Sequence, residues 1–277
     1  MTFRQQLDTA CARSRSLLCV GLDPDPALLP VEDVLDFNRQ IIAATHDLVC
    51  AYKPNLAFYE ALGLPGLRAL EQSLRFIRDM APGVLLIADG KRGDVGNTAQ
   101  AYARALFETW GFDAATVNPY GGRDSVEPFL EYRQRGVFFW CRSSNPGAGD
   151  LQDLVVASGQ EQGQPLYQVV ARRVQAWDRY ENAGLVLGAP YPEELGKVRA
   201  LCPETPFLIP GIGPQAGDLK QAVRLGTNAQ GRRAVIAASR AVLYASRGTD
   251  FAQKARQAAS ALRDAINQVL AQEGHPW

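Results

Sequence analysis

The feature that most constrains the fold is a series of short apolar segments, each ending in polar residues and followed by a stretch with helical periodicity. The apolar segments cover residues 17–22, 50–52, 84–88, 114–117, 137–141, 185–187, 207–209 and 234–238. The spacing of apolar residues predicts helices over 2–15, 31–48, 64–80, 98–110, 123–134, 164–181, 191–201, 215–225 and 250–272. Such alternation implies parallel strands joined by right-handed crossovers. Eight units in about 250 residues favour a closed (β/α)8 TIM barrel over an open sheet.

The chain is long enough for one large α/β domain or two small ones, with 277 residues of which 47% are hydrophobic. No linker, low-complexity tract or shift in composition divides it. We therefore predict a single barrel domain over residues 1–277, preceded by a leading helix at its N-terminus.

The charge distribution gives no sign of a polyanionic partner. Basic and acidic residues are equal in number, 29 of each, and no basic run stands out. Nucleic acid and anionic membranes are not expected partners, because binding them needs an excess of basic side chains. No stretch approaches the roughly 18 apolar residues of a membrane span, and the N-terminus has no apolar signal core.

Cysteine and histidine usage narrows the expected compartment and chemistry. The five cysteines, at positions 11, 19, 50, 141 and 202, form no CxxC pair, and several lie in apolar runs. They indicate reduced core residues of a cytoplasmic protein. Because His46 and His275 are the only histidines, we expect neither a zinc site nor a histidine-based triad. Lysine, aspartate and hydrogen bonds are then left to carry any chemistry.

Polar residues follow the carboxyl ends of the predicted strands. They are Asp23, Lys53, Asp89, Lys91, Asn118, Ser144, Gln215 and Arg240. In a closed parallel barrel these ends form one face, where the active sites of such enzymes lie. Residues far apart in the sequence should therefore converge on one pocket.

The segment after the third predicted strand carries the densest charge. Residues 89–94 read Asp-Gly-Lys-Arg-Gly-Asp and follow an apolar run directly. Because alternate side chains of a strand point to the same side, Asp89 and Lys91 should project together, with Cα atoms about 6.5 Å apart. Asp94 lies in the glycine-flanked turn. A solvated charged turn is the plain alternative, but these charges abut a strand predicted to be buried on both faces.

A second motif, Pro-Gly-Ile-Gly-Pro-Gln over residues 210–215, indicates a phosphate site. Gly211 and Gly213 would let the backbone approach an anion, and N–H groups at a helix start would point at it. Arg240 follows the next strand and offers a planar guanidinium suited to bidentate phosphate contact. An ordinary Gly-Pro turn is the alternative, but the loops after strands seven and eight are the usual phosphate site of this barrel.

Together these residues resemble the orotidine 5'-phosphate decarboxylase family, over nearly the whole chain and in its longer bacterial form. The most specific match is the motif Asp89-x-Lys91-x-x-Asp94-x-x-x-Thr98 after a strand. Gly90 departs from the family pattern, in which alanine or another small residue is expected. Its side chain would face away from the site, so the change should be tolerated.

The resemblance implies roles for the other residues. It implies catalytic roles for Lys53, Asp89, Lys91 and Asp94, and substrate binding by Asp23, Thr98, Asn118, Ser144, Gly211, Gly213, Gln215 and Arg240. Within the second set, the resemblance implies that Asp23 contacts the ribose and Ser144 the pyrimidine. Gln215 and Arg240 would contact the phosphate. The sequence leaves open whether Ser143 or Ser144 makes the ring contact.

The resemblance further implies conversion of orotidine 5'-monophosphate to uridine 5'-monophosphate and CO2, the last step of de novo UMP synthesis, without a metal or organic cofactor. It also implies a homodimer in which Asp94 and Thr98 reach into the neighbouring subunit's site. Loss of CO2 leaves a carbanion at C6, which the Lys91 ammonium could stabilise and then protonate. The surrounding carboxylates are expected to keep that ammonium charged.

Three alternatives remain at this stage. One is a Schiff-base aldolase acting on a sugar phosphate, with Lys53 or Lys91 as the nucleophile; a neighbouring carboxylate opposes the lowered pKa that such an amine needs. Another is a metal-dependent decarboxylase of sugar-acid phosphates on the same barrel. The third, from a different class, is a nucleotide-binding barrel without activity, against which the intact motif argues.

Overall fold

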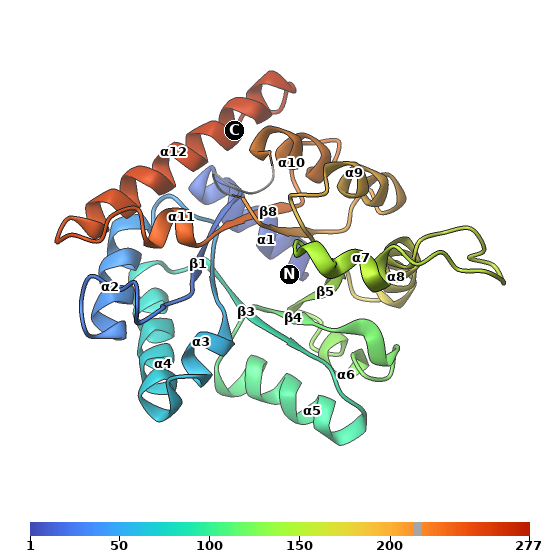
Figure 1. Cartoon of the computed structure of the whole chain (residues 1–277), viewed down its shortest axis with the longest axis horizontal. Helices are drawn as coiled ribbons and strands as arrows, with labels where there is room; N and C mark the ends of the chain where they lie inside the picture. Colours follow the sequence, from blue (N-terminus) through green and yellow to red (C-terminus); the bar gives the residue numbers. More distant parts are fainter. Residues whose placement is uncertain (213–217) are drawn as a thin grey trace.

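Eight parallel strands form a closed barrel in the computed structural model, which describes residues 1–212 and 218–277. The strands are β1 (Leu18–Leu22), β2 (Ala51–Pro54), β3 (Leu85–Arg92), β4 (Ala114–Val117), β5 (Gly136–Arg142), β6 (Ala183–Leu187), β7 (Phe207–Pro210) and β8 (Ala234–Ala238). Each pairs with its neighbour in sequence, and β1 pairs with β8 to close the ring (Figure 1). The helices cover the outer face, so the strands are buried on both faces over most of their length. The predicted (β/α)8 barrel is confirmed.

The helices surround the barrel (Figure 1). The longer ones are α1 (Phe3–Ser14), α2 (Val34–Thr45), α4 (Gly63–Met80), α5 (Gly96–Arg104), α8 (Leu166–Trp177), α9 (Pro192–Leu201), α10 (Leu219–Gly226) and α12 (Phe251–Gln272). The amphipathic spacing that predicted them also orients them. In α4, for example, Leu70, Leu74 and Ile77 are buried at helical intervals, and the opposite side is exposed.

Short helices in the loops differ from the sequence-based expectation. They are α3 (Leu56–Glu60), α6 (Glu127–Leu130), α7 (Gly149–Gln152), α11 (Arg240–Leu243), the π-helical turn η1 (Ala105–Thr109) and the 3-10 turns η2 (Pro119–Gly121) and η3 (Pro146–Ala148). The helix predicted over 123–134 is reduced to α6. The helix predicted over 98–110 begins earlier and continues into η1. Periodicity cannot show these details, because such short turns depend on contacts with the loops around them.

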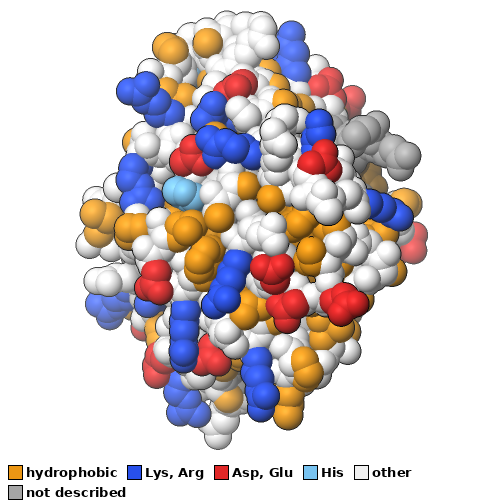
Figure 2. All heavy atoms as spheres, turned by 90° about the vertical axis from the view of Figure 1, so that its left-hand side faces the viewer, with side chains coloured by type: hydrophobic (Ala, Val, Ile, Leu, Met, Phe, Trp, Pro, Cys, Tyr) orange, Lys and Arg blue, Asp and Glu red, His pale blue; other side chains and the backbone are white. Residues whose placement is uncertain are grey.

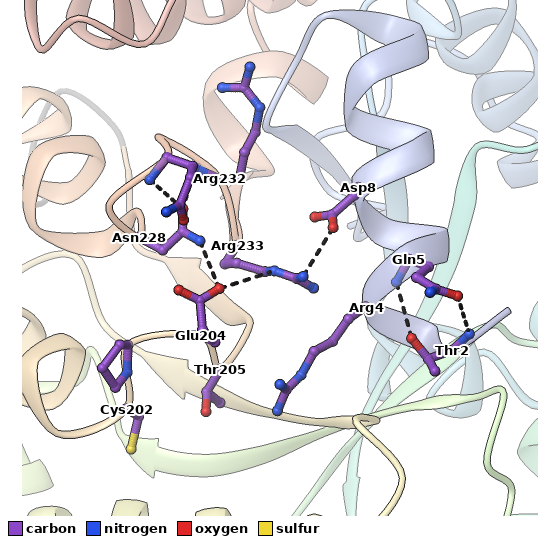
Figure 3. A network of polar contacts seen from close by, with 12 residues as sticks. Thr2, Arg4, Gln5, Asp8, Cys202, Glu204, Thr205, Asn228, Arg232 and Arg233 are labelled. Carbon is purple, nitrogen blue, oxygen red and sulfur yellow. Dashed lines mark hydrogen bonds and ion pairs between the residues drawn. The ribbon is translucent and has the colours of Figure 1, made fainter.

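The end of the barrel opposite the carboxyl ends is closed by α1, which lies behind the strands in Figure 1. Thr2 and Gln5 form a capping box at its start. The Phe3 ring packs edge-on against Phe138, with centroids 5.8 Å apart. Figure 3 shows Arg233 between Asp8 of α1 and Glu204, with N–O distances of 3.1 and 3.9 Å. This network joins the leading helix to the loops at the amino ends of β7 and β8.

Arg199 joins several loops at the same end of the barrel. Its guanidinium donates six hydrogen bonds, of 2.6 to 3.2 Å, to the backbone carbonyls of Cys202, Pro203, Thr205, Gly226 and Arg233. It also stacks 3.5 Å from the ring centroid of Phe207. Burial lowers the pKa of Arg199 to about 9. One planar side chain thus joins the end of α9 to the starts of β7 and β8.

We expect Arg199→Lys to destabilise the fold, because an ammonium has three donors and cannot reproduce the planar fork or its stacking. Loss of several charge-assisted hydrogen bonds should lower the melting temperature by roughly 5–10 °C. Thermal denaturation followed by circular dichroism measures the effect. Arg173→Lys is the matched control, because the Arg173 side chain is 54% exposed and its one ion pair among the described residues is with Glu161, at 3.4 Å. Equal melting temperatures for the two variants would contradict this role.

The surface formed by α2, α4 and α12 carries basic and acidic side chains that alternate over the whole face (Figure 2). No large area of a single sign is visible on this side. Among the described residues, no helix is both long enough and apolar enough to cross a bilayer.

Candidate active site

A cavity of about 710 Å³ opens at the carboxyl ends of the strands. Six of the predicted site residues line it: Asp23, Lys53, Asp89, Ser144, Gly211 and Arg240. Lys53 and Asp89 lie within β2 and β3, and the other four shortly follow β1, β5, β7 and β8. The closed topology therefore brings together residues that are more than 200 positions apart in the sequence, as expected for this face of the barrel.

The floor of the cavity holds a chain of alternating charges. The Asp89 carboxylate accepts from Lys53 Nζ at 2.8 Å through Oδ2 and from Lys91 Nζ at 2.7 Å through Oδ1. The side chain of Lys53 is 5% exposed, whereas that of Lys91 is 34% exposed. Lys53 and Asp89 line the cavity, and Asp89 holds the more exposed Lys91 beside it.

Burial opposes charge on both Lys53 and Asp89, but mutual attraction outweighs it. For Lys53, burial lowers the pKa, and the charges of Asp89 and Asp23 raise it by more, so the pKa lies above its ordinary value. For Asp89, burial raises the pKa, and the charges of Lys53 and Lys91 lower it by more, so the pKa lies below its ordinary value. Both groups are therefore charged at neutral pH.

The position of Lys91 depends on an irregularity in β3. Between Ala88 and Arg92 the pairing of β3 with β4 shifts in register, and Lys91 itself has a φ of 44°. Positive φ is uncommon for a residue with a Cβ and is often found at functional sites. The Lys91 N–H donates to Thr116 Oγ1 at 3.0 Å, and the same hydroxyl donates to Asp89 Oδ1 at 3.0 Å. Through these two hydrogen bonds, Thr116 holds the Lys91 backbone and the Asp89 carboxylate in place.

Asp23 follows β1, which only β2 separates from β3. Its Oδ1 accepts from the backbone N–H of Asn55 at 3.1 Å. Tyr244, which follows α11, donates its hydroxyl to the Asp23 carbonyl at 2.9 Å and accepts from the Asp25 N–H at 2.7 Å. The first and last loops of the barrel are therefore joined beside the cavity.

The predicted phosphate motif is described in part. Gly211 lines the cavity with a φ of 96°, a conformation that favours glycine. Arg240 begins α11 and is exposed at the cavity. Gly213 and Gln215 fall outside the described residues.

The two serines after β5 have different surroundings. Ser143 is 8% exposed, and its hydroxyl donates to Asn145 Oδ1. Ser144 lines the cavity. A Cβ built on Gly188 would lie 2.7 Å from Ser144 Cα, so only glycine allows β6 to approach this closely. The geometry favours Ser144 as the serine that faces a ligand.

Four predicted residues do not line this cavity among the described residues: Lys91, Asp94, Thr98 and Asn118. Lys91 is held beside the cavity through its contact with Asp89. Asp94 is half-buried and accepts from the Val95 N–H, and Thr98 is exposed. Asn118 caps η2 by accepting from the Tyr120 N–H at 3.0 Å. A Cβ at Gly90 would meet Leu56 and Arg92 rather than the motif charges, in agreement with an outward-facing position.

Sequence reasoning missed three residues of the site. The sequence does give a signal for Thr116, because it is the one polar residue within the apolar run 114–117. Ser239 and Tyr244 line the cavity from β8 and α11, but only the closure of the barrel places them beside Asp23. Within residues 1–212 and 218–277, no three or more His, Cys, Asp and Glu side chains are grouped so that they could hold a metal ion.

The barrel and its charged cavity define a TIM-barrel enzyme whose site combines lysine and aspartate charges with Arg240. Residues 16–257 match the model of the "Orotidine 5'-phosphate decarboxylase / HUMPS family". Since that match covers most of the chain, the protein belongs to this family.

Relatives named as orotidine 5'-phosphate decarboxylases match along the whole length. That of Dehalococcoides mccartyi is 53% identical over 269 residues, which are 96% of this chain and 98% of the relative. That of Thermomicrobium roseum is 48% identical over 286 residues, covering 99% and 100%. The structure of Leishmania donovani OMP decarboxylase has a TM-score of 0.84 and 38% identity, covering 97% of this chain and 98% of that one.

Proposed function

We propose that this protein converts orotidine 5'-monophosphate to uridine 5'-monophosphate and CO2, the last step of de novo UMP synthesis. The observation that carries the proposal is the Lys53–Asp89–Lys91 charge chain, whose first two members line a cavity that Arg240 also lines. Full-length similarity to decarboxylases of this substrate supports it. An absorbance assay of orotidylate loss with the purified protein tests it directly, and absence of turnover would refute it.

Stabilisation of the carbanion is assigned to Lys91. Loss of CO2 breaks the bond between C6 and its carboxyl carbon and leaves the electron pair on C6, with no adjacent π-acceptor. The Lys91 ammonium is held by Asp89 at 2.7 Å and lies 5.9 Å from the Trp140 ring centroid. A cation that is oriented before charge develops stabilises that charge without further reorganisation. Lys91 then transfers a proton from Nζ to C6, which completes UMP.

The buried half of the charge chain is assigned a supporting role. Lys53 and Asp89 hold each other in the charged state, and Thr116 adds a hydrogen bond to the carboxylate. This arrangement keeps the Asp89 carboxylate charged and fixed, so that it can orient the Lys91 ammonium. It also disfavours a Schiff-base mechanism through Lys53, because an amine nucleophile requires a lowered pKa and the pKa of Lys53 is raised.

The phosphate is assigned to the end of the cavity formed by Gly211, Arg240 and, outside the described residues, Gly213 and Gln215. The phosphate is not attached to the ring that loses CO2, so its binding cannot act on the C6 bond directly. Binding energy gained there can instead offset the cost of orienting the ring against Lys91.

We expect Arg240→Ala to weaken the use of orotidine 5'-monophosphate by roughly 10²-fold in kcat/KM, the size of a lost bidentate ionic contact. Turnover of orotidine, which lacks the phosphate, should hardly change. Steady-state kinetics on both substrates measures the difference. Arg247→Ala provides a control, because that arginine is not among the described residues lining the cavity. An equal loss on both substrates would make Arg240 structural.

We further propose that two subunits share their sites, with Asp94 and Thr98 completing the cavity of the partner. Neither residue lines the cavity of its own chain in the described structure. The segments that follow β3 and β4 expose apolar side chains, with Val95 63%, Tyr102 36% and Tyr120 84% exposed. Exposed apolar groups that lie together are typical of a protein interface. A symmetric dimer would cover them and carry Asp94 toward the second site.

A further inference from the structure

The long loop after β5 begins with residues 143–145, which we call the serine turn. Gln152, farther along the same loop, is attached to this turn. Its side chain lies in α7, and its Oε1 accepts two hydrogen bonds. One comes from the Ser143 backbone N–H at 2.8 Å and the other from Arg142 Nη1 at 3.3 Å. Gln152 is not among the described residues that line the cavity. Its contacts therefore act on the serine turn from outside.

Arg142 supports the same turn from beneath. It ends β5, its side chain is 3% exposed, and its Nη2 donates to Asp153 Oδ2 at 3.1 Å. The guanidinium lies 3.8 Å from the ring centroid of Tyr191. Tyr191 in turn donates its hydroxyl to the Asn145 carbonyl at 3.1 Å. Both ends of the serine turn are thus attached to one buried cation, through Gln152 at one end and Tyr191 at the other.

The inner side of the turn is confined by backbone. A Cβ on Gly188 would lie 2.7 Å from Ser144 Cα, and a Cβ on Gly211 would lie 3.4 Å from Ser144 Cβ. Ser144 therefore packs closely against the backbone that follows β6 and β7, in space that glycines leave open. Movement away from the barrel is opposed by Gln152, Arg142 and Tyr191. The position of Ser144 in the cavity therefore depends on close packing on one side and on the contacts of Gln152, Arg142 and Tyr191 on the other.

We propose that Gln152 is a positioning residue for the reaction, which sets the place of Ser144 against the pyrimidine ring. This inference rests on the proposed ring contact of Ser144. It gives the loop after β5 a role in recognition of the base, although Gln152 itself does not touch the substrate. The effect should be confined to ligands that carry a base.

Gln152→Leu removes the acceptor and tests the proposal. Affinity for UMP should fall about tenfold, the effect of one misplaced hydrogen bond. Affinity for ribose 5-phosphate, which has no base, should stay within twofold. Gln152→Glu keeps an acceptor oxygen beside Arg142 and should restore UMP affinity. Gln164→Leu is the matched control, because Gln164 lies in the same loop and accepts from Arg172 Nε at 3.0 Å. It should leave both affinities unchanged.

A double variant separates positioning from a general loss of structure. Because Gln152 acts through Ser144, Gln152→Leu should weaken UMP binding no further once Ser144→Ala is present. Additive losses, an equal loss for ribose 5-phosphate, or unchanged UMP affinity in Gln152→Leu would each overturn the inference. Unchanged UMP affinity in Ser144→Ala would show that Ser144 does not contact the pyrimidine ring. Orotidylate turnover by the parent protein, measured in parallel, reports separately on the proposed reaction.

Discussion

Replacing Lys91 with alanine should lower kcat by more than about 10³-fold while product binding changes little. A single preorganised donor is typically worth about 10²–10³ in rate, and Lys91 is assigned two functions, charge stabilisation and proton transfer. The buried Lys53–Asp89 pair, with its N–O distance of 2.8 Å, remains intact in this variant. The loss should therefore come from the reaction step rather than from unfolding.

Single-turnover kinetics and UMP titration separate these two effects of Lys91→Ala. Lys197→Ala is the matched control, because that lysine lies on α9 and its one ion pair within the described part of the chain is with the exposed Glu193. The control should retain parental kcat and UMP affinity. Turnover of Lys91→Ala within tenfold of the parent would show that another group stabilises the carbanion.

Mixing two inactive variants, Lys91→Ala and Asp94→Ala, should restore about a quarter of the parental activity. If the subunits share sites, a mixed dimer has one site with both substitutions and one site with neither. Random exchange makes about half of the dimers mixed, and one of the two sites in each is intact. Activity is measured after re-equilibration, with exchange followed by co-purification of differently tagged chains.

A second mixture provides the control for shared sites. Asp89 and Lys91 contact each other within one chain, so every site of a dimer that mixes Asp89→Ala with Lys91→Ala carries one substitution. No activity should return in that case. If exchange is complete and the Lys91→Ala and Asp94→Ala mixture also stays inactive, then Asp94 acts within its own chain.

Much of the fold could be predicted because the signals are local. Each strand is a short apolar run, and each long helix has an amphipathic repeat, so β3 and α4 can be identified from neighbouring residues alone. The short helices α6 and α7 could not, since helices of one turn have little stability of their own and depend on tertiary contacts.

The membership of the site was equally predictable, for a topological reason. Once eight parallel strands close into a barrel, their carboxyl ends share one face, and Asp23, Lys53, Asp89 and Arg240 must meet there. The roles of all these residues remain predictions, and Lys91, Asp94, Thr98 and Asn118 do not line the cavity of their own chain in the described structure.

The sequence by itself determined the barrel, the face that carries the site and the alternation of charge at residues 89–94, because these follow from local pattern and strand order. Only the tertiary structure decided how the charges are held. The bulge in β3, the double hydrogen bond of Thr116 and the attachment of the serine turn to Gln152 each join different strands or loops. Such contacts depend on side-chain packing at distances of a few ångströms, which no periodicity in the sequence records.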